Sequence, residues 1–339
     1  MTGDRMSTRR WFRLPDHYEV GREKIREFAR AVQNDHPVHR DDECARKLGY
    51  LGVVAPPTFT AILTVNGIRA VLNTVLPDRD LSQVLHAEQT FEIHRAVVAG
   101  DRLRCAVQIT SIRSPADTDF VALRFVVTDQ SGYLVRVEST TLAIRRGESV
   151  RPDIARLVDT VAMRGDGDRT PYLIPITAAA DLPTSASGPY RGPDVDTVPR
   201  ADRLAVGQAL PPRAARLTRG DLVNYAGVSG DPNPIHFSDA AAEFAGLPTV
   251  VAHGMLTMGV TAGYLTSWLG DPTAIRTFGV RFSRPAEIPA RAAADLELTG
   301  RIRALGPDTA TVALDVRAAG EQLFSRAFAE VQLSATTFE

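Results

Sequence analysis

Apolar residues recur along the second half of the chain with two different spacings, and each spacing predicts a different kind of element. Across residues 255–269 nearly every position is apolar or small, so that hardly any polar face remains. A helix of this composition buries its whole circumference, and we expect protein to surround it on nearly all sides. Further on, apolar and polar residues alternate in runs rich in β-branched residues, which predicts strands over residues 276–282, 294–304, 309–317 and 321–333.

The first half of the chain repeats this order. An apolar stretch over residues 59–76 precedes runs that alternate at residues 90–98, 102–112, 120–128 and 134–144. When the chain is displaced by the 197 positions that separate His39 from His236, about ten residues between positions 24 and 60 are identical without a gap. Short helices are predicted ahead of each apolar stretch, at residues 22–34 and 41–48 and again at 219–229 and 239–244. The two halves are therefore predicted to be diverged copies of one unit.

A buried helix followed by a four-stranded antiparallel meander is the order of elements in the hotdog fold, so we predict an α+β double hotdog. One hotdog domain spans residues 1–150 and the other residues 201–339. Residues 151–200, rich in Pro, Asp, Gly, Ser and Ala without periodicity, are predicted to be a linker. Because a lone meander leaves an exposed sheet edge, we expect the two sheets to join edge to edge within the chain. Pairing into a further homo-oligomer stays open.

Composition removes several classes of protein. The 339 residues carry a net charge of −1, with acidic and basic residues interspersed, which gives no footprint for nucleic acid or an anionic membrane. Cys44 and Cys105 have no second thiol or histidine at metal-ligand spacing, so no disulfide and no metal site is predicted. No apolar stretch reaches 18 residues, and we expect a cytoplasmic protein without a membrane segment.

Candidate chemistry is concentrated in one loop. Asp231 and His236 lie five positions apart with Pro232 and Pro234 between them. Because each proline ring fixes φ, the loop is predicted to be rigid, as a pair of proton-transfer groups requires. The alternative interpretation is that Asp231 caps a turn and His236 packs in the core.

The full string resembles the signature of the MaoC-like (R)-specific enoyl hydratases, which is an aromatic residue, then Gly-Asp-x-Asn-Pro, an aliphatic residue and His. The matching positions are Tyr225, Gly230, Asp231, Asn233, Pro234, Ile235 and His236. More narrowly, residues 217–268 resemble the catalytic B subunit of the actinobacterial (3R)-hydroxyacyl-ACP dehydratases of type II fatty-acid synthesis. Residues 15–101 resemble the non-catalytic A subunit of the same enzymes. The resemblance implies a fused A and B pair that covers nearly the whole chain apart from the linker.

Dehydration of a 3-hydroxyacyl thioester removes a weakly acidic proton from C2 and expels hydroxide from C3, so it needs a base and an acid. We assign His236 as the base toward C2 and Asp231 as the group that manages the departing water. The N–H of Gly254, at the predicted start of the buried helix, is expected to bind the charge that develops on the thioester oxygen. His253 and Asn233 are further candidates for substrate binding, although each has a structural interpretation: His253 packs or caps the helix start, and Asn233 braces the loop.

The first copy lacks most of this chemistry. Asn34 stands in place of the carboxylate, and Pro56 and Pro57 stand at the start of the apolar stretch, where proline has no N–H to donate. His39 remains alone, and Asp35, one position away, is the less favoured substitute for the missing carboxylate. We expect this copy to have lost catalysis and to bind the acyl chain.

The leading prediction is a lyase that dehydrates (3R)-3-hydroxyacyl-ACP in fatty-acid elongation. The alternative is an (R)-specific enoyl-CoA hydratase of fatty-acid degradation, because one acid/base pair catalyses both directions. A hotdog thioesterase usually has a carboxylate on its central helix, which residues 255–269 lack, and a non-enzymatic acyl-binding protein does not need the motif. An acyl-ACP or acyl-CoA thioester is thus the expected partner, without a cofactor. Acyl carrier protein is acidic, and its predicted docking residues on a solvent-facing edge are Arg276, Arg281 and Arg284.

Overall fold

The computed structural model describes residues 10–75, 84–145, 160–161, 172–183, 186–188 and 192–334. The first half of the chain contains three helices that precede a four-stranded meander. The helices are α1 (Arg22–Ala31), α2 (Asp42–Lys47) and α3 (Ala61–Val75), and the strands are β3 (Val84–Ile93), β4 (Arg102–Arg113), β5 (Thr118–Thr128) and β6 (Leu134–Arg145). Two short strands, β1 (Trp11–Arg13) and β2 (Tyr18–Glu19), come before α1.

The second half repeats this order. The helices are α5 (Arg219–Ser229), α6 (Asp239–Phe244) and α7 (Gly254–Leu269), and a short 3₁₀ turn, η6 (Pro234–His236), lies between the first two. The strands are β8 (Arg213–Leu217), β9 (Ile275–Phe282), β10 (Ala294–Leu305), β11 (Thr309–Ala318), β12 (Glu321–Gln322) and β13 (Phe324–Gln332). Gly132 and Gly320, at the last turn of each meander, have φ of 83° and 80°, a conformation that favours glycine.

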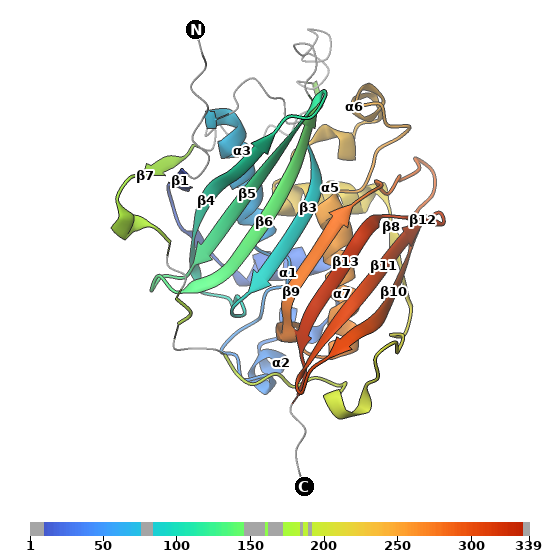
Figure 1. Ribbon diagram of the computed structural model, residues 1–339. Helices are drawn as coiled ribbons and strands as arrows, with labels where there is room; N and C mark the ends of the chain where they lie inside the picture. The colour runs from blue at the N-terminus through green and yellow to red at the C-terminus, as the bar shows by residue number, and fades with distance from the viewer. Residues whose placement is uncertain are drawn as a thin grey trace.

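The two meanders form one continuous sheet, as the sequence predicted. Its strand order is β7-β1-β4-β5-β6-β3-β9-β13-β11-β10-β8, where β7 spans Ile174–Ile176. The halves join through antiparallel pairing of β3 with β9, from Glu88 opposite Arg281 to Glu92 opposite Thr277. Figure 1 looks onto the outer face of this sheet, with α1, α5 and α7 behind it. The predicted double hotdog is confirmed.

Helix α7 is the most enclosed helix of the second half, as its composition predicted. Thirteen of its sixteen residues, from Met255 to Leu269, are buried. The helix ends at Gly270, whose φ of 76° allows the left-handed cap that glycine favours. Part of its cover comes from the first half, because a Cβ added at Gly259 would lie 2.6 Å from Val32 Cγ1. Small residues on α7 thus let the end of α1 approach closely.

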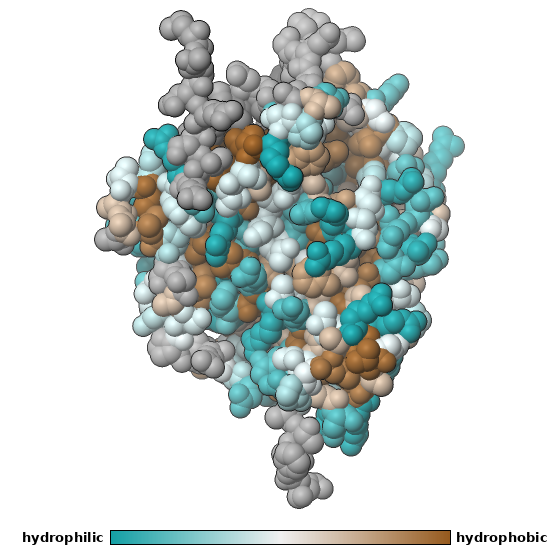
Figure 2. All heavy atoms as spheres, viewed as in Figure 1, coloured by the Kyte–Doolittle hydropathy of each residue, from teal (hydrophilic) through white to brown (hydrophobic). Residues whose placement is uncertain are grey.

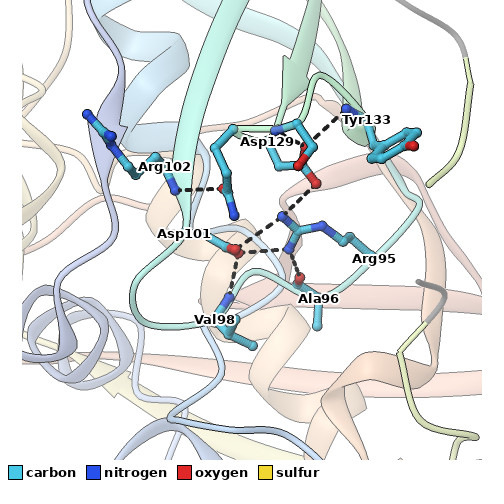
Figure 3. Close-up of polar contacts among 9 residues, drawn as sticks. Arg95, Ala96, Val98, Asp101, Arg102, Asp129 and Tyr133 are labelled. Carbon is cyan, nitrogen blue, oxygen red and sulfur yellow. Dashed lines mark hydrogen bonds and ion pairs between the residues drawn. The ribbon is translucent and has the colours of Figure 1, made fainter. Parts of the chain in front are cut away.

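The prediction for the first strand of the first meander was wrong at both ends. β3 runs from Val84 to Ile93 rather than over residues 90–98. Its beginning was missed because a β-bulge between His86 and Glu88 breaks the alternation of inward and outward residues. Its end was misplaced because Arg95 turns inward, donating hydrogen bonds to both carboxylate oxygens of Asp101 and to Asp129 (Figure 3).

Several short strands were not predicted, because two to five residues show no reliable period. They are β1, β2, β7 and β8. β7 lies inside the segment expected to be a linker and pairs with β1, from Trp11 opposite Ile176 to Arg13 opposite Ile174. The run predicted at residues 321–333 is interrupted at Leu323, which separates β12 from β13.

The outer face of the sheet is mixed in polarity, as Figure 2 shows, with hydrophilic and hydrophobic residues interspersed over both halves. Among the helices of the described ranges, none has both the length and the apolar character needed to cross a bilayer.

Candidate active site

The loop that follows α5 is held by its own side chains. Gly230 ends the helix with φ of 75°, a left-handed conformation, and the chain then turns back. The Asp231 N–H donates to Ser229 Oγ at 3.2 Å, and Asp231 Oδ1 accepts from the Asn233 N–H at 3.2 Å. Asn233 Oδ1 accepts from the Ile235 N–H at 3.3 Å and caps η6. The expected bracing role of Asn233 is therefore what its side chain does here.

His236 is buried and oriented for use as a base. Its Nδ1 lies 2.8 Å from the Val251 carbonyl oxygen, which only accepts, so the proton of the neutral ring lies on Nδ1. Nε2 then carries the lone pair. Burial lowers the pKa of His236, and the nearby Asp231 carboxylate opposes this only in part. A neutral imidazole with a free lone pair is the form that accepts a proton.

His253, the N-cap of α7, stacks on His236 with ring centroids 3.6 Å apart and planes inclined by 27°. The ring of Tyr225 also lies against it, with centroids 4.9 Å apart and planes inclined by 59°. Burial, and then the neighbouring His236, lower its pKa well below the usual value. His253 therefore stays neutral and fixes the plane of the His236 ring.

Asp231, His236 and His253 also have the spacing of a metal site, since their ligand atoms lie within 4.8 Å of one another. Lone pairs of imidazole nitrogens lie in the ring plane. The stacked rings of His236 and His253, inclined by only 27°, therefore direct their lone pairs along nearby planes that do not converge readily on one ion. This arrangement favours proton transfer over metal binding.

A cavity of about 350 Å³ joins Asp231 and His236 to the first half of the chain. It opens where β3 and β9 cease to pair, beyond Glu88 and Arg281. The first half contributes residues from α3, β3 and β6, which are Val65, Ile68, Arg69, Val84, Leu85, His86, Ala87 and Ala143. The second half contributes the motif loop, the start of α7 and the segment after β9, including Gly254, Met255, Phe282 and Arg284. Most of these side chains are apolar, as an acyl chain requires.

Gly254 begins α7 at the wall of this cavity. As the first residue of the helix, it has an N–H without an intrahelical acceptor, at the positive end of the helix dipole. A side chain at position 254 would clash, because an added Cβ would lie 2.9 Å from Cε1 of Phe282. Phe282 is itself packed against Phe324, with ring centroids 5.5 Å apart.

We expect Gly254→Ala to lower kcat/KM by about tenfold or more, because either the ring of Phe282 or the helix start must move away from the thioester position. The same overpacking is expected to reduce the free energy of unfolding by about 1–3 kcal/mol. Enzyme kinetics and denaturant unfolding measure the two effects. Gly227→Ala on α5 is the matched control, since an added Cβ there meets nothing within 4 Å. Unchanged kcat/KM in Gly254→Ala would remove this helix start from the site.

The corresponding position in the first half has a different chemistry. His39 has the same orientation as His236, with Nδ1 2.6 Å from the Val54 carbonyl oxygen. Asn34, however, places its amide 3.4 Å from Thr266 Oγ1, and the Pro57 carbonyl accepts a hydrogen bond from the buried Arg136. Asp35 is exposed and forms an ion pair with Arg40, so it does not replace the missing carboxylate.

Of the arginines predicted to dock a carrier on a solvent-facing edge, Arg281 and Arg284 are exposed as expected, but the edge position is wrong. β9 is a central strand of the sheet, so Arg276 and Arg281 are not on an edge. Arg276 donates to Gln332, Arg281 pairs with Glu88, and Arg284 lies 3.3 Å from Glu321. Of the three, only Arg284 lines the cavity.

The cavity residues of α3 lie in the apolar stretch of residues 59–76, in the half that the sequence expected to bind the acyl chain. Sequence reasoning missed the cavity residues that β3 and β6 contribute, among them His86. No local motif marks His86, since its bulge and the pairing of β3 with β9 bring it to a loop 145 positions later in the chain.

Comparisons with known proteins agree with this geometry. Residues 8–138 match the FAS1-like dehydratase domain region, and residues 204–321 match the MaoC like domain. A solved structure described as a MaoC-like dehydratase is 39% identical, with 97% of this chain and 99% of that chain covered and a TM-score of 0.87. A UPF0336 protein of Saccharopolyspora erythraea is 42% identical over 136 residues, which are 40% of this chain and 86% of that protein. A Mycobacterium tuberculosis protein described as having a double hotdog fold is 17% identical with a TM-score of 0.63, over 97% of both chains, and shows the fold alone.

The fold and the matched dehydratase domains define a double-hotdog hydro-lyase. The chain belongs to the MaoC-like dehydratase family, and its activity is that of a hydratase or dehydratase.

Proposed function

We propose that this protein interconverts (3R)-3-hydroxyacyl and trans-2-enoyl thioesters, with catalysis in the second half and acyl-chain binding shared with the first. The observation that carries the proposal is the single cavity in which Asp231 and a neutral, oriented His236 meet apolar walls from both halves. A thioesterase is less favoured because α7 contains no Asp or Glu.

In the dehydration direction, His236 Nε2 takes the proton from C2. The electron pair of the C2–H bond forms the C2=C3 double bond, and the C3–O bond breaks. The departing hydroxide receives the proton from the His236 imidazolium and leaves as water, while Asp231 accepts a hydrogen bond from it. The start of α7 at Gly254 stabilises the charge that develops on the thioester oxygen. Both side chains return to their initial state, so the cycle needs no other reactant.

The carrier that we favour is acyl carrier protein in fatty-acid elongation, with an enoyl-CoA in degradation as the second candidate. Arg69 and Arg284 both line the cavity, and Arg284 is exposed. Arg284 can exchange its exposed ion pair with Glu321 for an acidic group of a carrier protein or a phosphate of CoA.

The test is a panel of enoyl thioesters on acyl carrier protein, CoA and a short pantetheine, assayed with the full chain. We expect Arg284→Glu to raise KM for the acyl-ACP substrate far more than for the acyl-pantetheine, and the difference to shrink at high ionic strength. Arg281→Glu is the matched control, because Arg281 is exposed on the same strand region but does not line the cavity. Equal effects of Arg284→Glu on all carriers would contradict the docking role, and no turnover of any enoyl thioester would contradict the proposed function.

A further inference from the structure

The cavity is lined by a second imidazole, His86, which belongs to the other half of the chain. His86 lies on β3 at the β-bulge between residues 86 and 88, where β3 separates from β9. Bulges next to active sites redirect side chains, and this one coincides with the opening of the cavity. His86 lines the cavity together with Asp231 and His236.

The ring of His86 is held in place by the same aromatic side chain that limits Gly254. Its centroid lies 6.3 Å from that of Phe282, in an edge-on arrangement. Phe282 in turn contacts Phe324 and leaves no room for a Cβ at Gly254. One packed unit thus fixes the positions of His86 and of the helix start relative to each other.

The charges around His86 come from several elements. Burial lowers its pKa, the Asp231 carboxylate opposes this shift, and a charge on His236 would add to it. Among the residues that the structure describes, the other titratable and charged groups near the cavity are His253 and Tyr225 near the motif, Arg69 on α3, Arg284 after β9, and Glu88, which pairs with Arg281. His86 and His236 therefore compete for one proton beside the Asp231 carboxylate. The pKa of His253 is lowered too far for His253 to take part.

We infer that His86 is a positioning residue of this acid/base centre, contributed by the first half, and that it controls the protonation of His236. The inference rests on the proposed function. On this inference His86, beside Asp231, takes up the first proton when the medium is acidified, and its charge opposes protonation of His236 because two positive charges in one cavity repel. His236 then keeps its lone pair to lower pH. The first half thereby serves the chemistry as well as the acyl chain.

The test is the pH profile of kcat for hydration of crotonyl-CoA by His86→Gln and His86→Phe in the full chain. Without the competing imidazole, His236 is protonated more readily. The acid limb should therefore move to higher pH by about half a unit, a loss of about threefold on the limb. KM should change less than kcat. Both variants lack a titrating group and should share the shift, while Gln, which retains hydrogen bonding, should keep more of the activity at neutral pH.

The matched control is His94→Gln. His94 is half-buried just after the same strand, its pKa is also lowered by burial, and it does not line the cavity. Its profile should match that of the wild type. NMR titration of the His236 ring gives a readout other than turnover. The His236 signal is assigned as the one that is lost in His236→Ala. Its titration midpoint should move to higher pH in His86→Gln.

Profiles and titrations in the His86 variants that coincide with those of the wild type would overturn the inference and leave His86 as cavity wall. That result, with normal turnover by the wild type and loss in Asp231→Asn, would leave the proposed function intact. Absence of turnover by the wild type would instead contradict the proposed function.

Discussion

Replacing Asp231 with Asn is expected to lower hydration of a trans-2-enoyl thioester by about 10²–10⁴-fold, the usual contribution of general acid/base catalysis, because a neutral amide no longer holds the reacting water toward His236 as the carboxylate does. The variant keeps Oδ1, which accepts from the Asn233 N–H, so the loop should keep its shape. It also gives the second half the amide that Asn34 supplies in the first. His236→Ala should cause a loss of similar size, because Nε2 is then missing. Steady-state kinetics measures both losses, and thermal unfolding verifies that the variants fold.

Two controls separate the two halves of the chain. Asp35→Asn removes a carboxylate that is exposed and paired with Arg40, and it should leave kcat unchanged. His39→Ala removes the imidazole that occupies the position of His236 in the first half, and it should retain most of the activity after any loss of stability is taken into account. A loss in either control comparable to that of Asp231→Asn would show that the first half also performs catalysis.

Residues 201–339 produced as a separate chain are expected to self-associate or unfold, and to lose activity by at least about two orders of magnitude. Separation exposes the whole edge of β9 that pairs with Glu88 to Glu92. It also uncovers α7 at Gly259, where Val32 now packs, and removes one wall of the cavity. Size-exclusion chromatography with light scattering, circular dichroism and the crotonyl-CoA assay measure these changes.

The control for this experiment is the same cut with both halves co-expressed as two chains. Because the halves pair through a continuous sheet, the two chains should assemble and recover activity. A well-folded, active monomer of residues 201–339 alone would show that the second half does not depend on the first.

The sequence by itself determined the repeated unit and the reactive loop. The apolar composition of residues 255–269 required an enclosed helix, and α7 is enclosed. Strands with regular alternation were placed within one or two residues, as β10 and β11 show. Asp231 and His236 were identified as a pair because two prolines lie between them and the surrounding residues match a signature. Both signals are local in the sequence. The residues at Asn34, Pro56 and Pro57 likewise predict that the second half keeps the chemistry.

Only the tertiary structure decided what surrounds that pair. The bulge at His86 breaks the period of two, so local alternation hid the start of β3. The pairing of β3 with β9 then brings His86, Arg69 and Ile68 of the first half to the cavity. The stacking of His253 on His236 depends on how the start of α7 meets η6. Such contacts join residues that are far apart in sequence. Their geometry follows from sheet register and helix packing, which no local pattern encodes.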